Sequence, residues 1–117
     1  MRDYRLRKVK DYLCAHLDRR PTLAELETVS GLSRYHLCGI FRDAYGMSLG
    51  HYGNAQRLAE AVRRLKRGTP TKMIVAALGY VDEPYFSRVF KRHYGLPPGA
   101  WLALLRANDG LVGAARR

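Results

Sequence analysis

Apolar residues recur every three or four positions through most of this chain. In residues 2–18 they fall at Leu6, Val9, Leu13 and Leu17, which is the spacing of one face of a helix. The same spacing, with glycines and prolines that end helices, predicts further helices at residues 22–30, 34–45, 51–67, 71–78, 83–94 and 97–105. No segment shows the apolar–polar alternation that is typical of strands. The pattern therefore predicts an all-α fold.

Two stretches of the sequence nearly repeat each other: FRDAYGMSLGHY at residues 41–52 and FKRHYGLPPGAW at residues 90–101. At an offset of 49 residues the matching aromatic pairs are Phe41 with Phe90, Tyr45 with Tyr94, and Tyr52 with Trp101. Further upstream the offset becomes 48, and Gly31 pairs with Gly79. Repetition of this kind indicates a duplicated supersecondary unit.

The repeated unit consists of two helices around a short glycine turn. In the first copy, Thr22 and Glu25 have the spacing of a capping box at a helix start. Gly31 is placed to end that helix, since glycine enters the left-handed conformation at little cost. Ser33 is placed to cap the helix that follows. Helix, turn and helix in this order is the helix-turn-helix plan.

The second copy follows the same plan, with Asp82 as the expected cap and Pro84 in the first turn of its second helix. Between the copies, a helical stripe predicts a linker helix with inward positions at Tyr52, Ala55, Ala59, Val62 and Leu65. We therefore expect a first helix-turn-helix subdomain at 1–50, a linker helix at 51–68, a second subdomain at 69–106 and a flexible tail at 107–117.

The charge balance narrows the class of partner. Among 117 residues, 21 Lys and Arg oppose 10 Asp and Glu, and the formal net charge is +11. Such a surplus attracts polyanions, nucleic acid before all others. No apolar run approaches the 18 or so residues of a membrane span, and no secretory signal is evident. Two isolated cysteines, Cys14 and Cys38, fit a reducing cytoplasm.

In a helix-turn-helix, the second helix enters the major groove of DNA, so its outward face should carry donors. The base-reading candidates are Arg34, Tyr35, Cys38 and Gly39 in the first copy and Glu83, Tyr85, Ser87 and Arg88 in the second. Arginine is the usual bidentate partner of guanine. The candidates for phosphate contacts, which position the protein without reading sequence, are Ser33, His36, Arg42, Lys91 and Arg92.

Catalytic and metal chemistry find little support in the sequence. Cys14 with His16, and His36 with Cys38, are spaced two residues apart, and such pairs do not face each other on a helix. No phosphate-binding loop motif is present. We expect no metal, no cofactor and no enzymatic activity; a repair enzyme that uses Cys38 is the remote alternative.

The segment GYVDEPYFSRVFKRHYGLPPGAW, residues 79–101, resembles the second half of the DNA-binding domain of the AraC/XylS family. Residues 30–52, SGLSRYHLCGIFRDAYGMSLGHY, followed by Arg57, are similar to the first half of that domain. The resemblance covers roughly residues 5–106. It implies seven helices in two lobes, with two recognition helices in successive segments of the major groove. It also implies a bacterial-type transcription regulator, most often an activator that contacts RNA polymerase.

Several positions depart from the family pattern. Cys38 and Gly39 stand where long polar base readers are frequent, so the first recognition helix is expected to read DNA shape more than bases. Glu27 and Val75 occupy a position that is usually alanine. Because an unpaired buried carboxylate is costly, Glu27 must reach solvent or a basic partner. Trp101 and Leu102 replace an aromatic–arginine ending.

These observations predict a sequence-specific, double-stranded DNA-binding regulator of transcription, an activator that works in the cytoplasm and has no membrane partner. We expect a monomer that contacts RNA polymerase and holds no small-molecule effector site within this chain. The competing hypothesis is an architectural helical protein that binds DNA or RNA without sequence preference. A comparison of affinity for random and selected duplexes at one salt concentration separates the two.

Overall fold

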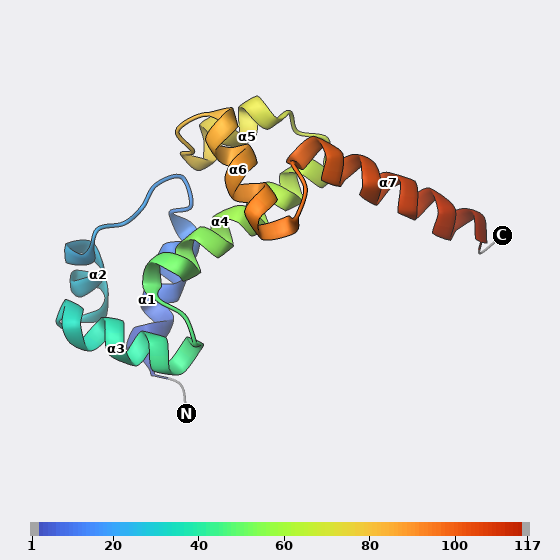
Figure 1. The fold of residues 1–117 in the computed structure, drawn as a ribbon. Coiled ribbons are helices and arrows are strands. Elements are labelled where there is room, and N and C mark those ends of the chain that lie inside the picture. Colours follow the sequence, from blue (N-terminus) through green and yellow to red (C-terminus); the bar gives the residue numbers. More distant parts are fainter. Residues whose placement is uncertain (1–2, 116–117) are drawn as a thin grey trace. The chain divides into compact units, whose positions relative to one another are not determined.

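The computed structural model describes residues 3–115, and within them it contains seven helices and no strand. The helices are α1 (Tyr4–Ala15), α2 (Leu23–Ser30), α3 (Arg34–Tyr45), α4 (Leu49–Lys66), α5 (Thr71–Leu78), α6 (Glu83–Tyr94) and α7 (Pro98–Ala115). Figure 1 follows this order along the chain. The prediction of an all-α fold with seven helices is confirmed.

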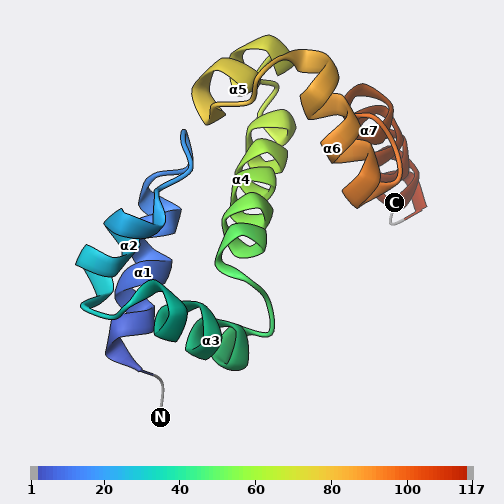
Figure 2. The ribbon, with the colours of Figure 1, turned by 60° about the vertical axis from the view of Figure 1, so that its left-hand side comes forward.

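The chain divides into two compact units, Met1–Glu60 (unit 1) and Ala61–Arg117 (unit 2). The division falls within α4, which Figure 2 shows as one continuous helix. In unit 1, α2 packs against both α1 and α3; in unit 2, α6 packs against both α5 and α7. The helix expected to link two subdomains thus contributes residues to both units.

Local capping explains where the helices of each helix-turn-helix begin and end. The Thr22 hydroxyl accepts the Glu25 N–H at 3.1 Å while the Glu25 carboxylate accepts the Thr22 N–H, which completes the predicted capping box. Gly31 ends α2 with φ of 75°, a left-handed conformation that glycine adopts without steric cost. Ser33 then caps α3, and Asp82 caps α6, each through its side-chain oxygen. The predicted caps are confirmed.

Three aromatic rings support the second helix of each helix-turn-helix, α3 in unit 1 and α6 in unit 2. In unit 1 the Phe41 ring lies 4.7 Å from Tyr45 and 5.6 Å from Tyr52, measured between centroids. In unit 2 the equivalent centroid distances from Phe90 are 4.6 Å to Tyr94 and 5.5 Å to Trp101. Both phenylalanines are fully buried. The repeated residues of the sequence are therefore the residues that anchor α3 and α6.

The rest of the unit 1 core comes from the apolar stripes of its helices. Of the positions predicted to face inward in the first helix, Leu6, Val9 and Leu13 are buried and Leu17 is half-buried. The buried members of this core are Leu6, Val9, Leu13, Leu26, Leu32, Leu37, Phe41, Leu49 and Tyr52. In unit 2 the same role falls to Ile74, Val75, Leu78, Phe86 and Phe90. Burial of these side chains is the main source of stability for helices this short.

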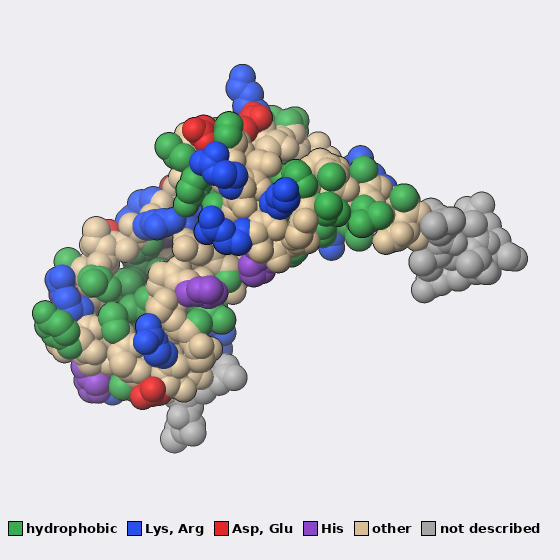
Figure 3. Space-filling view, viewed as in Figure 1, with side chains coloured by type: hydrophobic (Ala, Val, Ile, Leu, Met, Phe, Trp, Pro, Cys, Tyr) green, Lys and Arg blue, Asp and Glu red, His purple; other side chains and the backbone are tan. Residues whose placement is uncertain are grey.

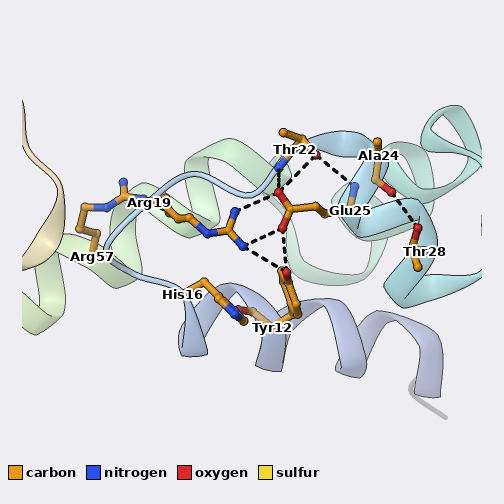
Figure 4. Close-up of polar contacts among 8 residues, drawn as sticks. All are labelled: Tyr12, His16, Arg19, Thr22, Ala24, Glu25, Thr28 and Arg57. Atoms are coloured by element: carbon orange, nitrogen blue, oxygen red, sulfur yellow. Dashed lines mark hydrogen bonds and ion pairs between the residues drawn. The ribbon is translucent and has the colours of Figure 1, made fainter.

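A polar network joins α1 to α2 across the loop between them (Figure 4). The Arg19 guanidinium donates to both Glu25 carboxylate oxygens at 2.9 and 2.7 Å, and the Tyr12 hydroxyl donates to the same carboxylate at 2.7 Å. The hydrogen bonds from Arg19, followed by those from Tyr12 and from the Thr22 N–H, hold the pKa of Glu25 far below its usual value. One carboxylate therefore connects two helices and the intervening loop.

Arg57 connects α4 to the same loop from the other side. Its side chain is buried at 6% exposure. It donates to the backbone carbonyls of Leu17 at 2.8 Å and Arg19 at 3.0 Å, and to the Asn54 side chain at 3.0 Å. Carbonyl oxygens satisfy this buried guanidinium, as a buried charge requires. The loop of residues 16–22 is thus held at both ends.

The end of the first helix and the buried positions of the linker helix differ from the predictions. The first helix ends at Ala15, because the His16 ring stacks on Tyr12 at 4.0 Å and lies within hydrogen-bonding distance of its carbonyl; Leu17 follows the helix and is half-buried. In α4, Leu58 and Ala61 are buried where Ala59 and Val62 were expected to be. Adjacent positions in the middle of α4 are buried, so its covered arc is wider than one stripe.

The closing helix is also longer than the sequence predicts. It was expected at residues 97–105, but α7 runs from Pro98 to Ala115. Most of the segment expected to be a tail is therefore helical, and residues 116–117 lie outside the described part. The run after Trp101 is rich in leucine and alanine, which are strong helix formers, and two glycines in it cost only about 1 kcal/mol each.

The Glu25 network predicts a specific dependence of stability on pH. The folded-state pKa of Glu25 lies below its unfolded value, so its contribution is present at neutral pH and is lost as pH falls below about 4. We expect Glu25→Gln to lower Tm at neutral pH. Between about pH 5 and pH 2 the free energy of unfolding should fall less steeply in the variant than in the wild type.

Urea unfolding followed by circular dichroism across that pH range checks this expectation. Asp43→Asn is the matched control, because Asp43 is exposed and makes no hydrogen bond or ion pair with another described residue. Equal pH slopes for the wild type and Glu25→Gln would contradict the role of the network.

Candidate nucleic-acid interface

The two helices that follow the glycine turns each bury one face and expose the other. α3 buries Leu37 and Phe41, and α6 buries Phe86 and Phe90. This spacing of four residues turns the remaining positions of each helix outward. Most of the predicted site residues are exposed; Arg34, Tyr85 and Ser87 are half-buried. Most of the residues predicted to contact DNA thus lie on the exposed faces of the two helices, and their contacts with DNA stay a prediction.

On α3, four predicted residues share one exposed face. Tyr35, Cys38, Gly39 and Arg42 follow the spacing i, i+3, i+4 and i+7. Tyr35 has the most exposed large side chain on it, at 86%. A Cβ built on Gly39 would meet no atom within 4 Å. This face is therefore shallow in its middle, with an aromatic ring near one end and a cation near the other.

At the start of α3, Arg34 is held by an acidic partner. Glu27 accepts the Arg34 backbone N–H at 2.8 Å and the guanidinium at 3.1 and 3.3 Å. The hydrogen bonds from the Arg34 guanidinium, followed by the one from its backbone N–H, lower the pKa of Glu27. The same side-chain contact raises the pKa of Arg34. The expectation that Glu27 reaches a basic partner is confirmed. The charge of the base-reading candidate Arg34 is already compensated within the protein.

The first turn of α3 also contains two predicted phosphate contacts. The Ser33 hydroxyl accepts the His36 N–H at 3.3 Å and leaves its own proton available for an acceptor. His36 is exposed. Unpaired N–H groups at a helix start favour anions, which is consistent with phosphate at this end.

The exposed face of α6 is more basic than that of α3. Arg88, Lys91 and Arg92 follow the spacing i, i+3 and i+4, and all three are exposed. Figure 3 shows Lys and Arg side chains gathered over the part of unit 2 where α6 lies. The Arg88 guanidinium lies 6.0 Å from the centroid of the Tyr85 ring. A cation over an aromatic face is stabilised in place, so Tyr85 positions Arg88.

The start of α6 lies beside a shallow depression of about 350 Å³. The predicted residues Glu83 and Ser87 line it, together with Thr71 at the start of α5. Sequence reasoning did not include Thr71. Pro70 precedes it, and α5 has no side-chain cap at this end. The contact between Tyr85 and Arg88 was also missed, although three-residue spacing on a helix predicts it.

The described residues do not bring together other functional chemistry. Cys14 and Cys38 are both free and exposed. Within residues 3–115, no three His, Cys, Asp or Glu side chains lie close enough together to hold a metal ion. Among the same residues, no helix combines the length and apolar character of a membrane span.

Comparison with known proteins connects this geometry to a family. A family model described as a helix-turn-helix domain matches residues 26–103. The uncharacterised HTH-type transcriptional regulator YbfP of Bacillus subtilis is 32% identical over 103 residues, which are 86% of this chain and 35% of that protein. The probable transcription factor PqrA of Proteus vulgaris is 36% identical over 59% of this chain and 57% of its own length. This chain thus spans about a third to a little over half of these relatives.

The multiple antibiotic resistance protein MarA of Escherichia coli is 26% identical over 80% of this chain and 74% of that protein. Among solved structures, the DNA-binding domain of AdpA in complex with a target DNA has a TM-score of 0.80 at 22% identity, covering 91% of this chain and 96% of that chain. The C-terminal domain of AraT from Geobacillus stearothermophilus has a TM-score of 0.78 at 23% identity, covering 87% and 86%. These structures share the fold of this chain.

The pairing of Glu27 with Arg34 predicts the response of DNA affinity to substitution. Glu27→Gln retains an acceptor for the Arg34 N–H but removes a negative charge beside α3. We expect the variant to bind an arbitrary duplex about three- to tenfold more tightly, with a salt dependence steeper by about one phosphate contact. Fluorescence anisotropy with a labelled duplex across a salt series measures both quantities.

Arg34→Gln is the informative control for this expectation. Because the Arg34 charge is already compensated, its loss should weaken DNA binding much less than Arg88→Gln does. A Glu27→Gln variant with unchanged affinity and salt slope would show that the charge of Glu27 does not affect DNA binding.

Proposed function

Because this chain belongs to the family of AraC-type helix-turn-helix domains, we propose that it binds specific double-stranded DNA sequences through α3 and α6 and thereby regulates transcription. Regulation of transcription by DNA binding is the function of the family. The assignment of base and phosphate contacts to particular residues of this chain is our proposal.

The observation that carries the proposal is the duplication of an exposed second helix on an identical support. In each unit, a helix that ends at a left-handed glycine is followed by a side-chain-capped helix, α3 or α6, that three aromatic rings anchor. Each second helix leaves its predicted reading face uncovered. A buried helix in either unit would have been incompatible with groove binding.

The two units are proposed to contribute differently. Arg88 is our first candidate for a base contact, since an arginine placed by an aromatic neighbour has the reach and donors for guanine. Lys91 and Arg92 are proposed to contact phosphates. In α3, Tyr35 is the main reading candidate, and the shallow surface at Cys38 and Gly39 favours close approach to the groove wall over hydrogen bonding to bases.

We further propose that the chain activates transcription as a monomer and contacts RNA polymerase beside its site. The relative named Btr of Bacillus subtilis is a transcriptional activator by its name, and it is 34% identical over 72% of this chain, though over only 16% of its own length. Activation of a reporter by the wild-type chain, with loss on Arg88→Ala, tests the sign of regulation.

Selection of preferred duplexes from a random pool tests the proposed function as a whole. We expect two selected segments whose centres are about one helical turn apart, since neighbouring major-groove segments on one face are about 34–36 Å apart. The selected duplex should bind at least about a thousandfold more tightly than random duplex at the same salt concentration. A ratio near one would instead favour an architectural protein without sequence preference.

Single substitutions on α6 separate base reading from phosphate contact. We expect Arg88→Ala to abolish preference at one base position, at a cost of about 1–3 kcal/mol for the preferred base. Lys91→Ala should weaken binding to all duplexes alike and reduce the salt slope by about one contact. Arg106→Ala, which removes an exposed arginine of α7, is the matched control. A uniform loss across all sequences in Arg88→Ala would remove that residue from base reading.

A further inference from the structure

A cleft of about 230 Å³ opens in unit 1, away from the exposed face of α3. It lies between the end of α1, the loop of residues 16–22, the start of α2 and the first half of α4. Its walls are mainly apolar, with contributions from Leu13, Pro21, Leu23, Leu26 and Leu49. Figure 3 shows hydrophobic side chains inside a hollow between α2 and α4. Its volume suits an aromatic ring or a short chain.

One wall of the cleft consists of bare helix. Gly50 and Gly53 line it from within α4, and neither has a positive φ. Each costs the helix about 1 kcal/mol relative to alanine. A Cβ at either position would meet no atom within 4 Å. Neither backbone conformation nor packing inside the unit requires glycine here, and glycine leaves the helix backbone open to close approach.

The charged groups that line the cleft are three arginines, Arg19, Arg20 and Arg57. His16 and Asn54 also line it, and no carboxylate is among the described lining residues. The Arg19 charge is shared with Glu25, and Arg57 donates to loop carbonyls. Arg20 is exposed and makes no hydrogen bond or ion pair with another described residue. An anionic group at the mouth of the cleft would therefore meet Arg20.

We propose that this cleft binds a small amphipathic carboxylate, with its apolar part against Gly50 and Gly53 and its carboxylate at Arg20. No small-molecule site in this chain is predicted from the sequence. The cleft forms where two segments that are distant in the sequence, residues 13–26 and 49–57, come together, so no contiguous motif predicts it. A ligand here contacts both the loop and α4, and it stabilises unit 1 because it binds the folded state alone.

Titration of the isotope-labelled full chain with 4-phenylbutanoate, followed by NMR, tests the site. We expect saturable shift changes confined to residues 13–26 and 49–57, with Kd on the order of 1 mM at the ligand efficiency of such molecules. The neutral 4-phenylbutanamide should bind about fivefold more weakly or worse, since it lacks the charge that Arg20 meets. Equal affinity for the two probes would overturn the proposal.

Glycine substitutions distinguish an occluded cleft from a damaged fold. Gly53→Leu should abolish binding of 4-phenylbutanoate, while Gly39→Leu, which also adds a side chain to open space within a helix of unit 1, should leave it unchanged. Gly53→Ala should raise Tm, because alanine favours helix, and lower affinity by about threefold or more. A variant that bound more weakly because its fold was damaged would have a lower Tm. A higher Tm together with weaker binding therefore indicates a blocked cleft. Wild-type affinity in Gly53→Leu would contradict the site.

The charged group has its own test. Arg20→Gln should reduce affinity for 4-phenylbutanoate to that for the amide and leave amide binding unchanged; an unchanged preference for the carboxylate would overturn the assignment of Arg20. A short peptide with one apolar and one acidic side chain serves as a competitor. If it binds this cleft more tightly than the free carboxylate, the occupant is a protein segment and the proposal fails. Duplex affinity, measured separately, remains the test of the proposed function.

Discussion

A helix can read DNA only if its opposite face is held in place, and in this protein three aromatic rings hold each of the two helices that are proposed to read DNA. The rings of Phe41 and Phe90 are fully buried. Phe41 makes an edge contact with Tyr52 near the start of α4, and Phe90 makes the equivalent contact with Trp101 near the start of α7. Such pairs contribute roughly 0.5–1.5 kcal/mol beyond the burial of their area. They also restrain rotation of the helix about its axis, and that rotation decides which side chains face outward.

Identical support with different exposed faces is how one duplicated unit acquires two tasks. α6 presents Arg88, Lys91 and Arg92 without acidic partners on the same stretch, whereas the arginine at the start of α3 is paired with Glu27. The exposed middle of α3 is small and nearly uncharged. This difference supports the proposal that affinity and base reading fall mainly to α6 and that the geometry of approach falls mainly to α3.

The helices, their caps and the anchoring rings could be predicted from the sequence because they depend on local patterns. Thr22, Ser33 and Asp82 cap the helices where spacing predicts, and the matched aromatics occupy matched positions. Prediction from the sequence failed where the outcome depends on distant partners. The buried arc of α4 depends on what covers each of its sides, and the end of α1 depends on His16 stacking against Tyr12. The cleft of unit 1 was not predicted because it too depends on segments that are distant in the sequence.

The glycines of this chain separate into two classes with different causes. Gly31, Gly46, Gly79 and Gly95 have positive φ at helix ends, where any other residue would be strained. Gly39, Gly50 and Gly53 lie within helices without positive φ and with open space where a Cβ would be. The second class lowers helix stability without a structural return inside the described chain. Gly39 lies on the exposed face of α3, and Gly50 and Gly53 lie in the wall of the cleft. Gly99 in α7 meets the same two criteria and lines the depression beside the start of α6. Three of these four glycines therefore lie on the two surfaces where a close approach from outside is proposed.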